Sequence, residues 1–255
     1  MRAPPVAEKQ GAALWTGDFD LDRWMDAWRV TKVSWGRESM QRLRDPSGRF
    51  GDILRVRYPK GSASSTVTRD AGAPVGGAQF YATLGLAPRD SLHLRYYMRF
   101  AEGFDFVKGG KLPGLYGGTV HSGGHVPDGT NGLSTRYMWR RSGDGEVYAY
   151  LPPSEDFGTS LGRGAWRFQP GRWYLLEQAV TLNAPGQRDG RVRVWVDEKP
   201  MLDQGGLLFR TVDSLKIEGL FFSTFFGGDD RTWAAPGDTY VDFARFAVAE
   251  GYIGP

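Results

Sequence analysis

Two pairs of polar residues lie two positions apart in the sequence, and they carry groups that could do chemistry. Ser134 and Arg136 form one pair, and Tyr148 and Tyr150 form the other. In a β-strand, a spacing of two places side chains on the same face of the sheet. An Arg can bind a carboxylate through two parallel hydrogen bonds, and a Tyr can give or take a proton. These residue types in this pattern suit proton transfer beside a bound carboxylate.

Lys111 lies in a glycine-rich segment that runs from Phe106 to Gly118. Its neighbours include Gly109, Gly110, Gly114, Gly117 and Gly118. Glycine lacks the side chain that would otherwise keep a ligand away from the backbone. We therefore expect this segment to let a bulky ligand approach and to expose the Lys111 ammonium at a surface.

The two pairs meet only if their strands form a hairpin in the right register. We expect a three-residue loop at residues 142–144, because the glycines there tolerate a positive φ. This loop places Arg136 opposite Tyr150. The same register places Met138 opposite Tyr148. A loop shorter by one residue would put the two pairs on opposite faces of the sheet.

The composition excludes several kinds of site. The chain has 255 residues, no Cys, and three His at positions 93, 121 and 125. Without Cys there is no disulfide scaffold, zinc finger, iron–sulfur site or thiol nucleophile. His121 and His125 lie four positions apart, but the Ser-Gly-Gly between them does not favour the helix that such a metal pair needs. We expect no metal site and no cofactor, and we expect His93 to be structural.

The charged residues favour an acidic partner. Of the 32 basic residues only 7 are Lys, which leaves 25 Arg, and the formal net charge is +3. Arg binds planar carboxylate or phosphate groups, so a polyanion is the expected partner. No basic cluster typical of nucleic-acid-binding proteins is present, and no run of 18 apolar residues predicts a membrane span. We expect an acidic polysaccharide, without nucleic acid or membrane.

Alternation of apolar and polar residues predicts an all-β fold. The predicted strands are Ser91–Phe100, Leu133–Trp139, Glu146–Leu151, Arg172–Leu182, Arg191–Asp197, Leu215–Phe226 and Thr239–Ala249. Clusters of Gly, Pro, Asn and Asp separate them. We predict a two-sheet antiparallel β-jelly-roll sandwich, concanavalin-like, as a single domain over residues 14–255 after a flexible terminus at 1–13. A short helix is expected over residues 18–28, with Asp20 as its N-cap and Leu21 on its apolar face.

The motifs around these residues resemble a known family. Gly109-Gly-Lys-Leu-Pro-Gly-Leu-Tyr-Gly-Gly118, then Leu133-Ser-Thr-Arg136 and Val147-Tyr-Ala-Tyr150, are similar to polysaccharide lyase family 14. Its members are jelly-roll alginate and glucuronan lyases, and the glucuronan lyases of family 20 are relatives. The resemblance covers roughly residues 75–250, and the first 70 residues match nothing in it. It implies that Lys111, Ser134, Arg136, Tyr148 and Tyr150 form the active site.

The resemblance implies β-elimination of a 1,4-linked polyuronate, which leaves 4,5-unsaturated uronate ends. The enolate-like intermediate needs cations or strong donors at the carboxylate, and Arg136 and Ser134 suit that role. Tyr148 or Tyr150 would then transfer the proton, with Lys111 as carboxylate neutraliser or alternative base; their order stays open. Nearby positive charge would lower the pKa of the base. We expect a monomer, secreted or periplasmic, whose leader is absent from this sequence.

Three further residues are candidates for substrate binding: His125, Asn131 and Arg193. His125 could line the substrate channel or act as the base, and Arg193 could equally belong to a solvated strand face. A non-catalytic carbohydrate-binding module is the alternative function, because it would share the fold and the positive groove. A glycoside hydrolase is less favoured, since it needs two carboxylic acids at a set separation.

Overall fold

The computed structural model describes residues 10–119, 122–154 and 157–255. The strands are β1 (Ala13–Gly17), β2 (Val30–Trp35), β3 (Met40–Arg44), β4 (Asp52–Tyr58), β5 (Ala78–Ala82), β6 (Ser91–Phe100), β7 (Gly109–Gly118), β8 (Gly132–Arg140), β9 (Asp144–Tyr150), β10 (Thr159–Arg167), β11 (Trp173–Thr181), β12 (Gly190–Val196), β13 (Lys199–Leu207), β14 (Gly219–Phe226) and β15 (Thr239–Ala249). The helical elements are α1 (Trp24–Ala27), α2 (Ser65–Ala71) and three 3-10 turns, η1 (Arg37–Ser39), η2 (Arg141–Gly143) and η3 (Arg231–Trp233).

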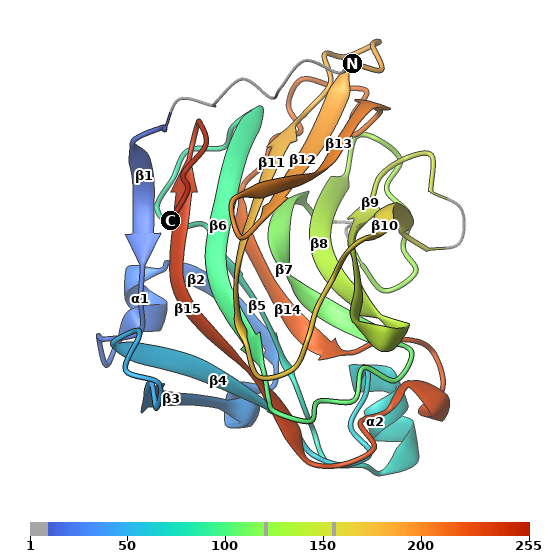
Figure 1. Ribbon diagram of the computed structural model, residues 1–255. Helices are drawn as coiled ribbons and strands as arrows, with labels where there is room; N and C mark the ends of the chain where they lie inside the picture. Colours follow the sequence, from blue (N-terminus) through green and yellow to red (C-terminus); the bar gives the residue numbers. More distant parts are fainter. Residues whose placement is uncertain (1–9, 120–121, 155–156) are drawn as a thin grey trace, which may run out of the picture.

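The strands form two antiparallel sheets that pack face to face (Figure 1). One sheet has the order β13-β12-β11-β6-β15-β4-β3, with β1 paired to β15. The other has the order β10-β9-β8-β7-β14-β5-β2. Strands that are neighbours in a sheet are often distant in the sequence, as in a jelly roll. The predicted two-sheet sandwich is confirmed.

The core lies between the sheets and is unusually aromatic. Alternate residues of several central strands point into one continuous cluster, as Tyr137 and Trp139 do from β8 and Phe222 does from β14. Because these inner faces are dry, the outer face of each sheet is left for polar side chains. The alternation therefore sends Arg136 and Met138 to the outside of the second sheet.

The N-terminal part is attached to the C-terminal end of the chain. The Gln10 side chain donates to the Ile253 carbonyl at 2.8 Å, and the Gly11 N–H donates to the Tyr252 carbonyl at 2.7 Å. Strand β1 then pairs with β15. Of the terminus expected to be flexible, residues 1–9 lie outside the described residues.

The helical predictions for the N-terminal region were wrong in detail. The helix expected over residues 18–28 is present but shorter, as α1 (Trp24–Ala27). Its N-cap position is Arg23 and not Asp20. The Asp20 carboxylate accepts instead from the Asp52 N–H at 2.8 Å, and Leu21 is 59% exposed. Strands β1 to β5, β7, β10 and β13 were not among the predicted strands. Charged or glycine residues interrupt the alternation in several of them.

The hairpin register differs from the predicted one by two residues. Arg136 lies opposite Tyr148, and Ser134 lies opposite Tyr150. The turn η2 has the same three-residue length as the predicted loop but begins and ends one residue earlier, with Ser142 and Gly143 both at positive φ. Since a shift of two preserves the face of every side chain, the expected set still shares one side of the sheet.

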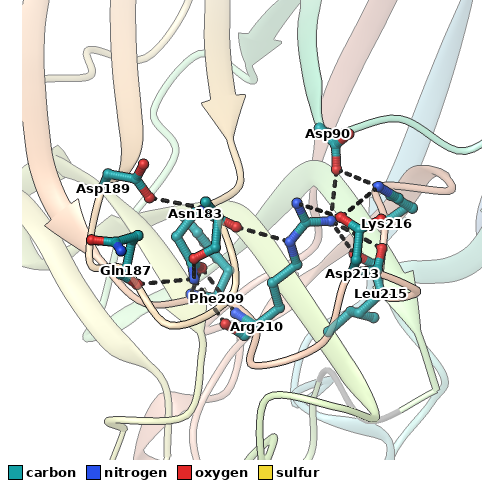
Figure 2. A network of polar contacts seen from close by, with 10 residues as sticks. Asp90, Asn183, Gln187, Asp189, Phe209, Arg210, Asp213, Leu215 and Lys216 are labelled. Carbon is teal, nitrogen blue, oxygen red and sulfur yellow. Dashed lines mark hydrogen bonds and ion pairs between the residues drawn. The ribbon is translucent and has the colours of Figure 1, made fainter.

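A buried polar network fixes the segment between β13 and β14 (Figure 2). The fully buried Asn183 side chain accepts from the N–H groups of Phe209 and Arg210, at 2.7 and 3.0 Å. It donates to the Arg210 carbonyl at 2.8 Å. The Arg210 guanidinium in turn pairs with Asp90 at 2.6 Å. One amide side chain thus joins the segment after β11 to the segment that leads into β14.

The Asn183→Ala substitution should destabilise the protein strongly. It leaves the buried N–H groups of Phe209 and Arg210 without acceptors, at about 1–3 kcal/mol each. We expect the free energy of unfolding to fall by about 3 kcal/mol in chemical denaturation. The matched control is Gln187→Ala, because Gln187 contributes only its backbone carbonyl to Asn183. An equal effect of the two substitutions would contradict the role of the Asn183 side chain.

Candidate active site

A cleft of about 530 Å³ lies on the outer face of the second sheet. Strands β5, β7, β8, β9 and β14 form its floor. Residues of β2, α2 and η3, and residues of the loops before β8 and β10, contribute to its walls. The described residues that line it are Trp35, Ser64, Ser65, Thr66, Val67, Gln79, Lys111, Ser122, Gly123, Gly124, Arg136, Met138, Arg140, Tyr148, Tyr150, Phe157, Phe225, Gly228, Asp229 and Trp233. Four of the five predicted catalytic residues therefore share one cleft.

Lys111 lies deep in this cleft and is only 8% exposed. Its Nζ contacts the Met138 sulfur at 2.9 Å and lies 3.6 Å from the ring centroid of Tyr148. Burial, and then the positive charges of Arg136 and Arg140, hold the pKa of the Lys111 ammonium well below its ordinary value of 10.5. The amine is thereby moved toward its neutral, basic form.

The glycines around Lys111 allow close packing of the strands and, contrary to the prediction, do not open the surface around the lysine. A Cβ at Gly110 would lie 2.2 Å from the Trp139 ring and 2.4 Å from the Phe225 carbonyl oxygen. A Cβ at Gly114 would lie 2.2 Å from the Thr135 carbonyl oxygen. These glycines let side chains and neighbouring strands pack closely against β7, and they do not expose the lysine. The expectation of an exposed ammonium was wrong.

Arg136 is the second buried cation of the cleft, at 2% exposure. Its Nη1 donates to the Ser223 hydroxyl at 3.1 Å, and its Nε has no hydrogen-bond partner among the described residues. The guanidinium lies 4.7 Å from the Phe221 ring centroid and 5.6 Å from that of Tyr150. Burial lowers the pKa of Arg136, although the group stays charged at neutral pH.

The two tyrosines are oriented by backbone groups of the walls. The Gly158 N–H donates to the Tyr148 hydroxyl at 3.1 Å, and the Gly124 N–H donates to that of Tyr150 at 3.4 Å. Their rings meet edge to face at 5.8 Å. Burial raises the pKa of Tyr148, and the neighbouring Tyr150 adds to the rise. The positive charges of Arg140 and Arg136 lower the Tyr148 pKa by less than burial raises it. The expectation that nearby positive charge would give Tyr148 a lowered pKa was therefore wrong.

An ion pair lies behind Lys111. Arg140 donates from Nε and Nη2 to one oxygen of Glu146, at 2.8 and 2.7 Å. Glu146 is fully buried, and its Oε2 has no partner among the described residues. The Arg140 guanidinium also lies 5.3 Å from the Tyr148 ring centroid. The positive charge of Arg140 thus acts to lower the pKa of both Lys111 and Tyr148.

The other predicted site residues lie outside the lining of the cleft. Ser134 is fully buried on β8, opposite Tyr150. Asn131 accepts from the Asp128 N–H at 3.1 Å in the loop before β8, where His125 is exposed. Arg193 lies on β12, in the other sheet, with its guanidinium over Trp195. The structure therefore does not bring Arg193 to the cleft.

Several residues of the cleft were not singled out by the sequence. Gln79 accepts from the Ser223 hydroxyl at 3.2 Å, which completes a chain to Arg136. Tyr81, two residues after Gln79 and outside the cleft lining, has its pKa raised to about 12 by burial. The alternation in Ala78–Ala82 is a signal that could have found both residues. Phe225, on β14, also lines the cleft.

The cleft offers little for metal or hydrolytic chemistry. Asp229 is the one carboxylic acid among its described lining residues. Within residues 10–119, 122–154 and 157–255, no three His, Cys, Asp or Glu side chains group to hold a metal ion. The same residues include no helix long and apolar enough to span a membrane. The basic groups and phenols of the cleft could bind an anionic group and transfer a proton.

Comparison with known proteins identifies the family of the chain. The family model for polysaccharide lyase 14 matches residues 47–246, and the chain belongs to that family of enzymes acting on polysaccharides. The match begins earlier than the predicted resemblance and includes β4, β5 and α2. A sequence search among curated proteins finds no significant match.

Solved structures share the fold over nearly the whole chain. A PL-14 alginate lyase from Aplysia kurodai is 30% identical, with a TM-score of 0.80, and the match covers 94% of this chain and 99% of that one. A mutant of alginate lyase Aly36B, in complex with alginate tetrasaccharide, is 21% identical, with a TM-score of 0.72 and coverages of 94% and 95%. An endo-β-1,4-glucuronan lyase from the fungus Trichoderma reesei is 10% identical, with a TM-score of 0.62 and coverages of 93% and 95%.

The lowered pKa of Lys111 can be measured directly. In protein carrying ¹³C-labelled lysine, the Lys111 side-chain resonance should titrate well below the ordinary lysine value of 10.5. Arg140→Gln removes a positive neighbour and leaves Glu146 unpaired, so it should raise the Lys111 pKa. The Lys111→Arg variant assigns the resonance. A Lys111 titration near 10.5 in the parent protein would contradict the described environment.

Proposed function

We propose that the protein cleaves a 1,4-linked polyuronate, alginate or glucuronan, by β-elimination in this cleft. One observation carries the proposal: a buried lysine with lowered pKa lies 3.6 Å from the ring centroid of a protonated tyrosine. The buried Arg136 lines the same cleft. Base, acid and carboxylate-binding group thus lie within the space of one or two sugar units. The family membership supports the same reaction class.

Arg136 is the residue that we assign to the substrate carboxylate. Its Nε–H is unused by the described residues, and Nη1 is held by Ser223. A carboxylate that accepts from this guanidinium loses negative charge, which makes the adjacent C5 proton more acidic. The negative charge that develops on the carboxylate in the intermediate is stabilised by the same contact. Ser134 is too deeply buried to share this role directly.

Lys111 is assigned as the base and Tyr148 as the acid. The neutral Lys111 amine takes the C5 proton, and the electron pair of the C–H bond forms the C4–C5 double bond. The C4–O4 bond breaks, and Tyr148 gives its proton to the leaving O4. C5 is bonded to C4, the carbon that carries O4. The proton donor and the proton acceptor must therefore lie close together, as Tyr148 and Lys111 do. The raised pKa of Tyr148 keeps its proton available.

Single substitutions in the cleft should abolish turnover and preserve the fold. We expect Lys111→Ala and Tyr148→Phe each to lower kcat roughly 10²- to 10⁴-fold, the usual contribution of a general base or acid. Turnover is followed by the near-ultraviolet absorbance of the unsaturated product on defined polyuronates. His125→Ala serves as the control, since His125 is exposed and outside the cleft lining. Full activity of Lys111→Ala would overturn the assignment, and binding of every polyuronate without turnover would favour a carbohydrate-binding module.

Activity should rise from neutral toward alkaline pH. The base form of Lys111 grows as pH rises through its pKa, which lies below the ordinary 10.5. The acid form of Tyr148 is lost only above its raised pKa, which exceeds 10.0. We expect kcat/KM to climb on the acid side with the pKa of Lys111 and to fall again only at high pH. A maximum near pH 5 would be incompatible with these roles.

A further inference from the structure

Three arginines converge on the outer face of the eight-stranded sheet, on the opposite side of the sandwich from the cleft. Arg49 lies 5.2 Å from the ring centroid of Phe50 and 5.1 Å from that of Tyr97. Arg95 lies 5.6 Å from the Tyr97 centroid, and Arg245 lies 5.7 Å from the Phe50 centroid. The two rings are themselves 4.9 Å apart. We call Arg49, Arg95 and Arg245 the arginine cluster.

No member of the arginine cluster forms an ion pair with a carboxylate of the described residues. Arg99, on the same face, pairs with Asp242 at 2.8 Å. Three carboxylates, Asp18, Asp20 and Asp52, line a neighbouring depression with Arg95 and Arg245 but pair with neither. The nearby carboxylates and the aromatic rings offset part of the repulsion between the three guanidinium groups. The guanidinium groups form no ion pair with these carboxylates, so their hydrogen-bond donors could serve an anionic ligand.

The backbone at Arg245 supports a role for its side chain. Arg245 has a φ of 46°, in the left-handed region, at a bulge in the pairing of β15 with β6. A bulge re-aims a side chain, and a residue other than glycine in this conformation carries strain. The side chain so placed is exposed and stacks on Phe50. The bulge therefore brings a third guanidinium to a face that already holds two.

We propose that the arginine cluster is a second binding surface for a polyuronate chain, separate from the catalytic cleft. The choice of ligand rests on the proposed function. A polyuronate carries a carboxylate on every sugar, and a guanidinium binds a carboxylate through two parallel hydrogen bonds. Stacking on Phe50 and Tyr97 orders the guanidinium groups before the ligand arrives, which reduces the entropy lost on binding.

The two surfaces lie on opposite faces, so a short oligosaccharide cannot occupy both. A long polymer can be held at the arginine cluster while another part of it, or a neighbouring chain, enters the cleft. Such tethering raises the local concentration of substrate at the cleft without changing the chemistry there. The arginine cluster should therefore increase the rate at which dilute polymer is cleaved and should not change the rate for short oligosaccharides.

The first test measures retention of inactive protein by polyuronate in affinity electrophoresis at low salt. In a Lys111→Ala background, Arg49→Gln with Arg245→Gln should weaken retention roughly fivefold, as expected for the loss of two exposed charge contacts. The matched control is Arg172→Gln with Arg191→Gln, which removes the same charge from arginines that are paired with Asp197 and Asp203. The control should change retention less than twofold. If the cluster variant and the control variant lost retention equally, net charge alone would explain the loss, and the proposal would be overturned.

The second test uses protein with Lys111 intact. The Arg49→Gln, Arg245→Gln variant should cleave a short polyuronate oligosaccharide at the parent rate and should cleave dilute polymer several-fold more slowly. Parent-like behaviour on polymer, in both retention and turnover, overturns the second surface and leaves the cleft assignment standing. If the parent protein cleaves neither oligosaccharide nor polymer, the proposed function itself fails. Should Arg245→Gln unfold the protein, Arg49→Gln with Arg95→Gln makes the same test.

Discussion

Two buried basic side chains without a carboxylate in contact set the constraint on which the site depends. Lys111 and Arg136 are 8% and 2% exposed, and their described contacts are a sulfur, a hydroxyl and aromatic rings. Burial disfavours the charged form of both groups, so Lys111 moves toward the neutral amine while Arg136 keeps its charge. The same burial thus gives the cleft a basic amine and a cation side by side, and a carboxylate that pairs with Arg136 would offset the unfavourable burial of its charge.

The sequence predicted the sandwich because its central strands alternate cleanly. Ser91–Phe100 and Thr239–Ala249 were predicted with the bounds that the structure gives them. Strand β7 lacks that pattern, because its glycines serve close packing against the neighbouring strands. The side chains of the cleft followed from spacing and from family resemblance. Depth of burial did not, because Met138 and Tyr148 meet Lys111 only through the pairing and packing of separate strands.

Each sheet has a dry inner face and a charged outer face, and each outer face carries arginines without a carboxylate partner among the described residues. In the cleft, Arg136 is enclosed and held by Ser223. On the opposite face, Arg49 and Arg245 are exposed and rest on rings. Enclosure suits a group that must act on one sugar at a time. An open array suits many weak contacts along a polymer.

The pairing of β8 with β9 decides which side chains reach the cleft. A register moved by two residues leaves Arg136, Tyr148 and Tyr150 on the same side of the sheet, whereas a move by one would send the phenols into the core. The turn itself can therefore vary in length and sequence, provided that the strands on either side keep the parity of their pairing.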